Sequence, residues 1–291
     1  MLQAKHATPN NWYTGKKTYF CTLMRKSLSI IAIFTIALTL TSCKSEFERI
    51  RASTNAPLML EKAYSYYENE DWDKAQILFE SALNYYRARQ EAEKLYFHYA
   101  YTFYHMKQYS LAGNYFKNFA NTFTNSPYRE EALFMVAFSE YNQSPSYRLD
   151  QTHTYTAING FELFANTYPN SEKVADCNRL IDELRNKLEK KAFYQAQLYF
   201  DLKDYRASVI SFENLLQDFP ETKQADKVRY MITNAAYSLA DLSIYEKQAE
   251  RFRETINYAD IFLEKFPESE YKNEVLRLQQ QAEAQLKQFE Q

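Results

Sequence analysis

The sequence predicts an all-α protein built from stacked helical hairpins, and three observations lead to this fold class. Only Gly113 and Gly160 lie beyond an amino-terminal leader, and Pro is scarce, so few tight turns are available to join strands. The 26 Tyr and 21 Phe recur at three- and four-residue spacings, as in Tyr96, Tyr99 and Phe103, which share one helical face. The sequence also repeats itself along its length.

The leader precedes the fold and is excluded from it. Arg25 and Lys26 precede an apolar run at 28–40, which is followed by Thr41, Ser42 and Cys43. This pattern is typical of a lipoprotein signal peptide, and the run is shorter than the roughly 18 residues that a spanning helix needs. We therefore expect a lipoprotein signal peptide over residues 24–42. A transmembrane anchor and a secretory signal with an incidental cysteine are the alternatives.

Lipidation is the modification predicted for the mature chain. Cleavage places Cys43 at the new amino terminus, where we expect it to carry a diacylglycerol and an N-acyl lipid such as palmitate, and no other cofactor. Residues 43–57 then form a lipidated linker. Residues 1–23 carry no apolar periodicity, and we expect them to be a non-native extension ahead of a better start at Met24.

Charge and cysteine content narrow the function. The leader holds five of the 35 basic residues and none of the 37 acidic residues, so the mature chain has a net charge of −7. This balance opposes nucleic acid as a partner. Once Cys43 carries lipid, Cys177 is the single thiol of the mature chain, so no intramolecular disulfide is expected and stability must come from packing.

The repeat consists of an aromatic residue, a small residue and a second aromatic residue at fixed offsets. The first two copies are Trp72, Ala75 and Phe79, then Tyr109, Ala112 and Phe116, a shift of 37 positions. The small residue recurs as Ala157, Ser208 and Thr255, at steps of 45, 51 and 47, and Phe161 and Phe212 follow the first two. We therefore expect about five helical hairpins over residues 58–270.

The spacing matches the tetratricopeptide pattern, in which small residues let two helices approach and aromatic residues fill the gap. The packing positions are Ala63, Tyr66, Trp72, Ala75, Phe79 and Ala82 in the first unit, and Ala100, Phe103, Tyr109, Ala112, Phe116 and Phe119 in the second. A TPR-like solenoid is therefore predicted.

The hairpin ends repeat as well. An aromatic residue is followed three positions later by Ser or Thr at 123–126, 168–171, 219–222 and 266–269, and Pro follows the aromatic residue in the last three. Pro cannot continue a helix, and Ser or Thr can cap the next one. The later repeats exceed the usual tetratricopeptide length because of a polar loop at 142–152 and a long first helix at 172–202. Residues 271–291 are predicted to form a C-terminal capping helix, which a solenoid needs for solubility.

The first helix of each hairpin lines the concave side of such a solenoid, so its non-packing residues form a groove. These residues are mostly aromatic and suit an extended, aromatic-bearing peptide. The predicted peptide-binding groove consists of Leu60, Tyr64, Tyr67, Lys94, Phe97, Tyr101, Tyr104, Phe134, Phe138 and Tyr141. The alternative for each residue is packing against a neighbouring helix.

Catalytic patterns are not recognised in the sequence, which contains no Gly-rich phosphate loop, no nucleophile elbow and no paired His at zinc spacing. His98 and His105 lie seven positions apart without a carboxylate at ligand spacing, which favours packed or solvated histidines over a metal site. We therefore expect a protein that is not an enzyme.

One set of residues goes beyond the general hairpin pattern. It comprises Tyr168-Pro169-Asn170-Ser171, Asp176, Arg179-Leu180, Leu184, Leu188-Glu189, Ala196, Tyr199, Asp204-Tyr205 and Asp218-Phe219-Pro220-Glu221-Thr222. Over about Leu58 to Glu270 the chain resembles the BamD family, the outer-membrane lipoproteins of the β-barrel assembly machinery. The long fifth hairpin, with its insert at 242–247, and the extra terminal helix depart from the family pattern, so no docking residues are assigned there.

This resemblance implies a scaffold and substrate receptor that is lipid-anchored to the outer membrane and faces the periplasm. Its amino-terminal repeats would receive unfolded outer-membrane proteins, and its carboxy-terminal repeats would dock a BamA-like barrel subunit. Two alternatives stay open: another TPR lipoprotein, of pilus assembly or cell division, and a substrate-binding lipoprotein of nutrient uptake. The second alternative is typically rich in Trp, whereas this chain has two.

Overall fold

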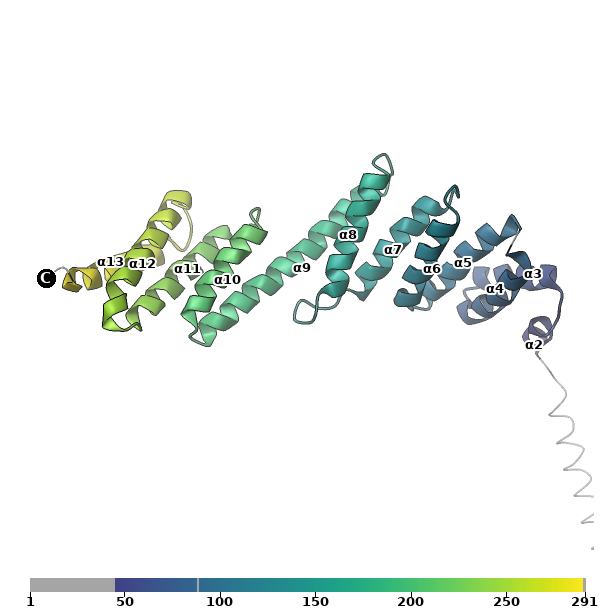
Figure 1. Ribbon diagram of the computed structural model, residues 1–291, viewed down its shortest axis with the longest axis horizontal. Helices are drawn as coiled ribbons and strands as arrows, with labels where there is room; N and C mark the ends of the chain where they lie inside the picture. The colour runs from purple at the N-terminus through teal and green to yellow at the C-terminus, as the bar shows by residue number, and fades with distance from the viewer. Residues whose placement is uncertain (1–44, 88, 290–291) are drawn as a thin grey trace, which may run out of the picture. The chain divides into compact units, whose positions relative to one another are not determined.

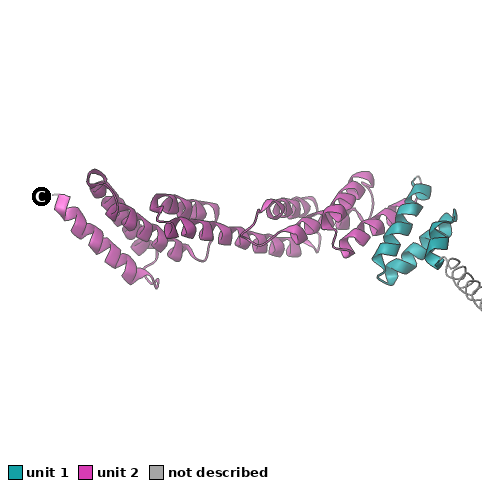
Figure 2. Ribbon diagram, turned by 90° about the horizontal axis from the view of Figure 1, so that it is seen from below, with its two compact units in different colours: residues 1–87 teal, residues 88–291 magenta. Residues whose placement is uncertain are grey.

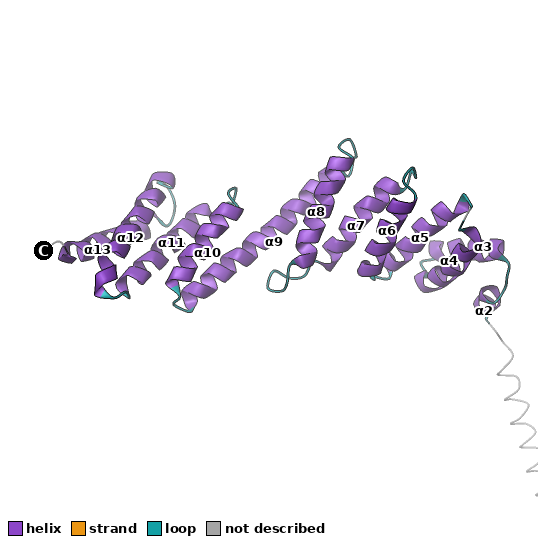
Figure 3. Ribbon diagram, in the orientation of Figure 1, coloured by secondary structure: helices purple, strands orange, loops and turns teal. Residues whose placement is uncertain are grey.

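The structure is a computed structural model that describes residues 45–87 and 89–289 (Figure 1). Within these residues all regular structure is helical, as Figure 3 shows, which confirms the predicted all-α class. The predicted extension, the signal peptide and Cys43 lie outside the described residues.

The chain divides into two compact units, residues 1–87 and residues 88–291 (Figure 2). The helices described in the first unit are α2 (Glu46–Arg51), α3 (Ala56–Glu68) and α4 (Trp72–Tyr86). Helices α3 and α4 form the first predicted hairpin. At the position of α2, the sequence analysis predicted a linker and no helix.

Helix α2 packs against the first hairpin through two apolar side chains. The ring of Phe47 meets Tyr66 edge-on with 5.8 Å between centroids, and Ile50 is buried. The side chain of Ser45 caps the helix by accepting a hydrogen bond from the backbone N–H of Glu48. Helix α2 is therefore held on the first hairpin, and its contact through Phe47 lies four residues after Cys43 in the sequence.

The second unit contains the other four predicted hairpins, a terminal helix and a short 3₁₀ turn. Its elements are α5 (Glu91–His105), α6 (Tyr109–Thr122), α7 (Arg129–Gln143), α8 (Thr152–Thr167), α9 (Val174–Asp201), α10 (Tyr205–Asp218), α11 (Ala225–Asp241), α12 (Tyr245–Lys265), α13 (Lys272–Leu286) and η1 (Lys287–Phe289). Each helix packs against the next, and α13 contacts both helices of the last hairpin. This is the arrangement of a TPR-like helical repeat.

The small residues of the repeat lie where the two helices of a hairpin cross. Ala75, Ala112, Ala157, Ser208 and Thr255 all have 0% exposure, so the predicted positions are fully buried. Where the small residue is polar, its hydroxyl is satisfied locally: Ser208 donates to the carbonyl of Ala196 at 3.0 Å. The aromatic partners Phe79, Phe116, Phe161 and Phe212 are also fully buried. Each such ring contributes about 1.5–3 kcal/mol by leaving water.

The loops of the second unit fall into two sets on opposite edges. Figure 1 shows the loops that end one hairpin and begin the next along its upper edge, and the turns inside the hairpins along its lower edge. Two of the inner turns contain a lysine in the left-handed region, Lys107 with a φ of 60° and Lys203 with a φ of 63°. Glu70, in the first unit, has the same conformation. These turns are tight although they contain no glycine.

The loop between α7 and α8 is longer and is fixed onto α9. Lys187 donates to the hydroxyl of Ser144 at 2.8 Å, and Lys191 donates to the backbone carbonyl of Leu149 at 2.7 Å. The buried amide of Gln151 donates to two backbone carbonyls within the loop. The polar character expected of this loop therefore reflects a defined hydrogen-bond network.

Candidate peptide-binding surface

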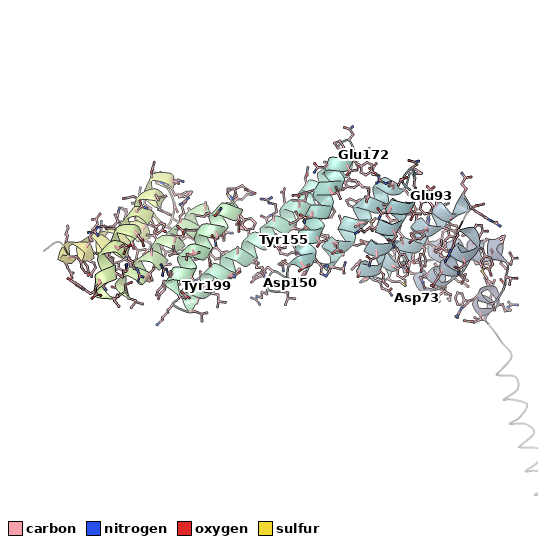
Figure 4. All side chains as sticks on the ribbon, viewed as in Figure 1. Asp73, Glu93, Asp150, Tyr155, Glu172 and Tyr199 are labelled. Atoms are coloured by element: carbon pink, nitrogen blue, oxygen red, sulfur yellow. The ribbon has the colours of Figure 1, made fainter. Side chains whose placement is uncertain are left out.

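Four hydroxyl-to-carboxylate hydrogen bonds tie the loop that follows each hairpin of the second unit to the first helix of that hairpin, and we call them the staples. In each, a Ser or Thr of the loop donates to an acidic residue on that first helix. The pairs are Ser126 with Glu93 at 2.5 Å, Ser171 with Glu130 at 2.5 Å, Thr222 with Glu189 at 2.5 Å and Ser269 with Asp226 at 2.7 Å. Figure 4 labels Glu93 at the start of α5.

The staple hydroxyls correct one expectation about helix capping. Ser126 accepts a hydrogen bond from the backbone N–H of Tyr128, and Ser171 accepts one from Lys173. These N–H groups belong to the residues that precede α7 and α9, so each hydroxyl closes the turn before the helix rather than its first turn. The same hydroxyl also donates to the staple acid, which the sequence pattern did not predict.

The staples allow the first helices to be aligned with one another, because in each helix the staple acid lies opposite the hydroxyl of the loop that follows the hairpin. One position after the acid stand Lys94, Glu131, Lys190 and Lys227, and four positions after it stand Phe97, Phe134, Phe193 and Tyr230. The predicted groove residues of α5 and α7 are therefore equivalent to one another.

Half-buried aromatic rings run from α5 to α7, and we call them the aromatic row: Tyr101, Tyr104, Phe134, Phe138 and Tyr141. The hydroxyl of Tyr101 donates to Glu131 at 2.7 Å, and the rings of Tyr104 and Phe138 stack with 6.1 Å between centroids. Phe138 stacks in turn on Phe134 at 5.5 Å and on Tyr141 at 5.6 Å. These rings pack side by side, yet part of each stays accessible.

The row is polar at its rim. Tyr141 donates to Glu183 of α9 at 2.8 Å, and burial, with this hydrogen bond, raises the pKa of the Tyr141 hydroxyl. Burial also raises the pKa of Tyr104. Both hydroxyls therefore stay protonated at neutral pH; the Tyr141 donor is used by Glu183, and the Tyr104 hydroxyl can donate to a peptide carbonyl or carboxylate.

Two predicted groove residues of α5 differ from the row. Phe97 is 7% exposed and stacks on Tyr128 with 4.7 Å between centroids, so the structure places it in the core between hairpins. Lys94 is exposed. The expectation of a groove-facing ring at Phe97 is corrected, because the next hairpin covers that ring.

In the first unit, Leu60, Tyr64 and Tyr67 are half-buried on α3. Tyr64 meets Phe79 edge-on at 5.1 Å, and Tyr67 meets Trp72 edge-on at 5.0 Å. Burial raises the pKa of Tyr67 to about 12. These rings both hold α4 against α3 and leave accessible surface on α3.

The sequence prediction stopped at α7, although the register continues. Lys190 and Phe193 of α9, and Lys227 and Tyr230 of α11, occupy the positions of Lys94 and Phe97. A sequence signal that could have extended the groove to these residues is the distance from each loop Ser or Thr back to an acidic residue on the first helix of the same hairpin. This distance is 33, 41 or 43 positions.

The described residues contain no group of three or more His, Cys, Asp or Glu side chains that could hold a metal ion. A ring nitrogen of His98 lies 2.8 Å from the carbonyl of Lys94, and burial lowers the pKa of this histidine. Among these same residues, no helix combines the length and apolar character needed to cross a bilayer.

The stacked hairpins and their accessible aromatic row define the class of this protein: a TPR-like helical repeat protein. The sequence matches the YfiO family, described as outer membrane lipoprotein, over residues 54–240. The chain belongs to this family of outer membrane lipoproteins.

Two relatives carry more specific names. The chain is 24% identical over 235 residues to a protein of Aquifex aeolicus named putative outer membrane protein assembly factor BamD, covering 80% of this chain and 75% of the relative. It is 22% identical over 227 residues to outer membrane protein assembly factor BamD of Buchnera aphidicola, covering 74% and 92%.

Solved structures of helical repeat proteins are similar at lower identity. The TPR2AB domain in its pHSP90 complex, from yeast Sti1, is 11% identical, with a TM-score of 0.38 and coverage of 78% of this chain and 98% of that chain. The apo form of RapI is 17% identical, with a TM-score of 0.33 and coverage of 80% and 83%. Membership of the family rests on the sequence match.

Proposed function

We propose that this protein is a scaffold and substrate receptor in outer-membrane protein assembly, anchored by lipid on Cys43 to the outer membrane and facing the periplasm. Family membership and the names of the two relatives support a role in assembly. The signal peptide pattern supports the anchor.

The observation that carries the receptor part is the aromatic row. An unfolded barrel protein presents extended segments in which aromatic and aliphatic side chains alternate with polar ones. Accessible rings with protonated hydroxyls at their rim offer such a segment both apolar contact and hydrogen bonds. The proposed partners are therefore unfolded outer-membrane proteins and, as the scaffold's neighbour, a BamA-like barrel subunit.

The receptor part is tested by replacing Tyr101 and Tyr104 together with Ala. We expect affinity for a peptide from the carboxy-terminal strand of a barrel protein to fall about tenfold, because aromatic anchors cost more than about 1 kcal/mol when truncated. Fluorescence anisotropy measures the affinity, and circular dichroism checks that helix content is unchanged.

A matched control removes two other accessible rings. Tyr85 on α4 is 47% exposed and Tyr245 on α12 is 68% exposed, and both lie outside the predicted groove. The Tyr85→Ala/Tyr245→Ala variant should bind the peptide as the unmodified protein does. If both double variants lost the same amount of affinity, the aromatic row would not be the binding site.

The scaffold part is tested by affinity purification of the full-length lipoprotein in mild detergent, with mass spectrometry of the proteins that co-purify. Recovery of a large barrel protein with periplasmic repeat domains supports the assembly function. Recovery of a transporter or of a pilus or cell-division component instead would transfer the protein to one of the alternative classes.

A further inference from the structure

In three repeats, the residue that precedes the next helix after the hairpin covers the ring four positions after the staple acid. Tyr128 stacks on Phe97 with centroids 4.7 Å apart, and Tyr271 stacks on Tyr230 at 4.9 Å. Between these two repeats, the ammonium of Lys173 lies 4.8 Å above the ring of Phe134. All three covering residues stand two positions after the staple hydroxyl.

The repeat that begins in α9 departs from this arrangement. Its equivalent residue is Gln224, two positions after Thr222, which has no ring or charge to place on Phe193. The ammonium of Lys227, from α11 itself, lies 4.8 Å above that ring instead. A cleft of about 410 Å³ opens there, lined by Phe193 and Tyr194 of α9 and by Gln224 and Lys227 across from them. In this repeat the loop residue leaves a cleft beside Phe193, and the ring is covered by Lys227 of α11 instead.

The length of α9 extends this cleft. Helices α5, α7 and α11 begin one or two residues before their staple acids, whereas α9 begins at Val174, several turns before Glu189. The additional turns form a wall beside the loop that follows α10, and a second cleft of about 460 Å³ lies along it. The two clefts share Asn186, Glu189 and Gln224, and we call them together the α9–α11 trough.

The trough has the dimensions of an extended peptide. Its α9 wall runs from Asp182 to Phe193, which at 1.5 Å per residue is about 17 Å. An extended chain covers this distance with about five residues. The side chains of Asn186 and Gln224 are exposed and line the part that the two clefts share. Each amide offers a donor and an acceptor, as a peptide backbone requires.

Charge indicates that the peptide carries an acidic residue. Lys190 and Lys227 both line the cleft at Phe193, and neither forms an ion pair with a carboxylate of the described residues. Their ammonium groups lie above rings instead, Lys190 above Tyr147 and Lys227 above Phe193, each at 4.8 Å. The same cleft contains one carboxylate, that of Glu189, which accepts the hydroxyl of Thr222. Two ammonium groups against one carboxylate leave the cleft at Phe193 with a net positive charge, which favours an anionic ligand over a cationic one.

Exposed aromatic surface indicates the second side chain. Tyr194 is 50% exposed although it lines the same cleft, and one part of it stacks on Tyr147 at 5.2 Å. Phe193 beside it is half-buried. An aromatic side chain that enters the cleft would contact both rings, as a tyrosine contacts the equivalent ring in two other repeats.

We propose that the α9–α11 trough binds an extended segment of an unfolded polypeptide that carries an acidic residue beside an aromatic residue. The aromatic side chain packs against Phe193 and Tyr194, the carboxylate pairs with Lys190 and Lys227, and the amides of Asn186 and Gln224 hold the peptide backbone. This site rests on the proposed receptor function and adds a second point of contact, separate from the aromatic row.

The probe is a fluorescein-labelled heptapeptide, Gly-Ser-Glu-Tyr-Thr-Ser-Gly, with a counterpart in which Gln replaces Glu. Fluorescence anisotropy is measured with the full-length lipidated protein in detergent. The Glu peptide should bind about tenfold more tightly than the Gln peptide, because a charge-assisted hydrogen bond is lost in the second. Equal binding of the two peptides, or no binding of either, overturns the proposal.

Two variants locate the binding. Gln224→Tyr places in the trough the ring that fills this space in two equivalent repeats, so it should abolish binding while raising or preserving the thermal midpoint. Lys190→Gln/Lys227→Gln should remove the preference for Glu. The control Lys117→Gln/Lys265→Gln makes the same change of charge on exposed positions of α6 and α12 and should leave both affinities unchanged.

The outcomes separate this site from the proposed function. If Gln224→Tyr keeps the heptapeptide affinity, the trough is not the site, whatever binds at the aromatic row. If the barrel-derived peptide binds through Tyr101 and Tyr104 but the heptapeptide does not bind, the receptor function stands and this inference falls. If neither peptide binds, both fall.

Discussion

At the scale of single residues, Gly160 marks a close approach of α8 to α7. A Cβ atom at this position would lie 2.9 Å from the Cβ of Ala137 and 3.3 Å from its Cα. Ala137 is 1% exposed and belongs to the core formed with α9. Neither helix can move apart there without opening that core.

Replacement of Gly160 by Ala is therefore expected to destabilise the protein. Overpacking costs about 1–3 kcal/mol, which exceeds the roughly 1 kcal/mol that Ala gains in helix propensity. The thermal midpoint measured by circular dichroism should fall by a few degrees. Gly113→Ala is the matched control, because its Cβ would lie 3.3 Å from the Ser139 Cβ, and its midpoint should change little. A higher midpoint for Gly160→Ala would contradict this account.

The sequence correctly predicted which side chains are buried where helical periodicity alone decides their burial. The small residues at the crossings, such as Ala112 and Ala157, are fully buried as expected. The burial of Phe97 was not predicted, because the ring that stacks on it, Tyr128, lies at the start of the next hairpin. Periodicity along one helix carries no information about such a partner.

At the scale of elements, the tight turns inside the hairpins use non-glycine residues in a conformation that glycine adopts freely. Lys107 and Lys203 follow the ends of α5 and α9, and the N–H groups of the next residues bond back to the carbonyls of Phe103 and Tyr199. These turns connect helices whose closest contacts are set by the small residues. The left-handed backbone conformation is kept at these turns although it is disfavoured for Lys.

Lys203→Gly should therefore stabilise the second unit, by about 0.5–1 kcal/mol, because the strain of a side chain at positive φ exceeds the greater flexibility of Gly in the unfolded chain. Urea unfolding followed by circular dichroism measures the change. Lys203→Ala keeps a Cβ and should give no gain. The interpretation would be wrong if the two variants had the same stability.

The hairpins were predicted from sequence with boundaries close to those observed. The long first helix expected at 172–202 is α9 (Val174–Asp201), and the loop expected at 142–152 falls between α7 and α8. Helix α2 was missed because a helix of 6 residues is too short to show a periodic pattern. The staples were missed because a Ser hydroxyl and a carboxylate far apart in the sequence are each common on solvated surfaces.

At the scale of the whole molecule, the division into two units was not expected. One solenoid was predicted over residues 58–270, and the structure divides the chain after Arg87. No proline, glycine or change of composition marks this place in the sequence. A boundary of this kind depends on the contacts made by each unit, which local sequence does not state.

The proposed attachment of the molecule to a membrane rests on one residue, Cys43. Metabolic labelling with palmitate should label the unmodified protein, and intact mass spectrometry should find it without residues 1–42 and with the mass of its lipid. Cys43→Ala should lose the label. Cys177→Ala should keep it, because the thiol of Cys177 is buried and burial raises its pKa to about 11. Label on the Cys43→Ala variant would exclude the predicted anchor.

The staples also bear on how the chain folds as it is exported. Each joins residues only 33, 41, 33 or 43 positions apart, and in every one the acid precedes the hydroxyl. A chain that emerges from a translocation pore amino end first therefore has each acid seated in its helix before the matching hydroxyl arrives. For such a chain we expect each hairpin to dock on a finished neighbour, so that folding can begin before the carboxy terminus has emerged.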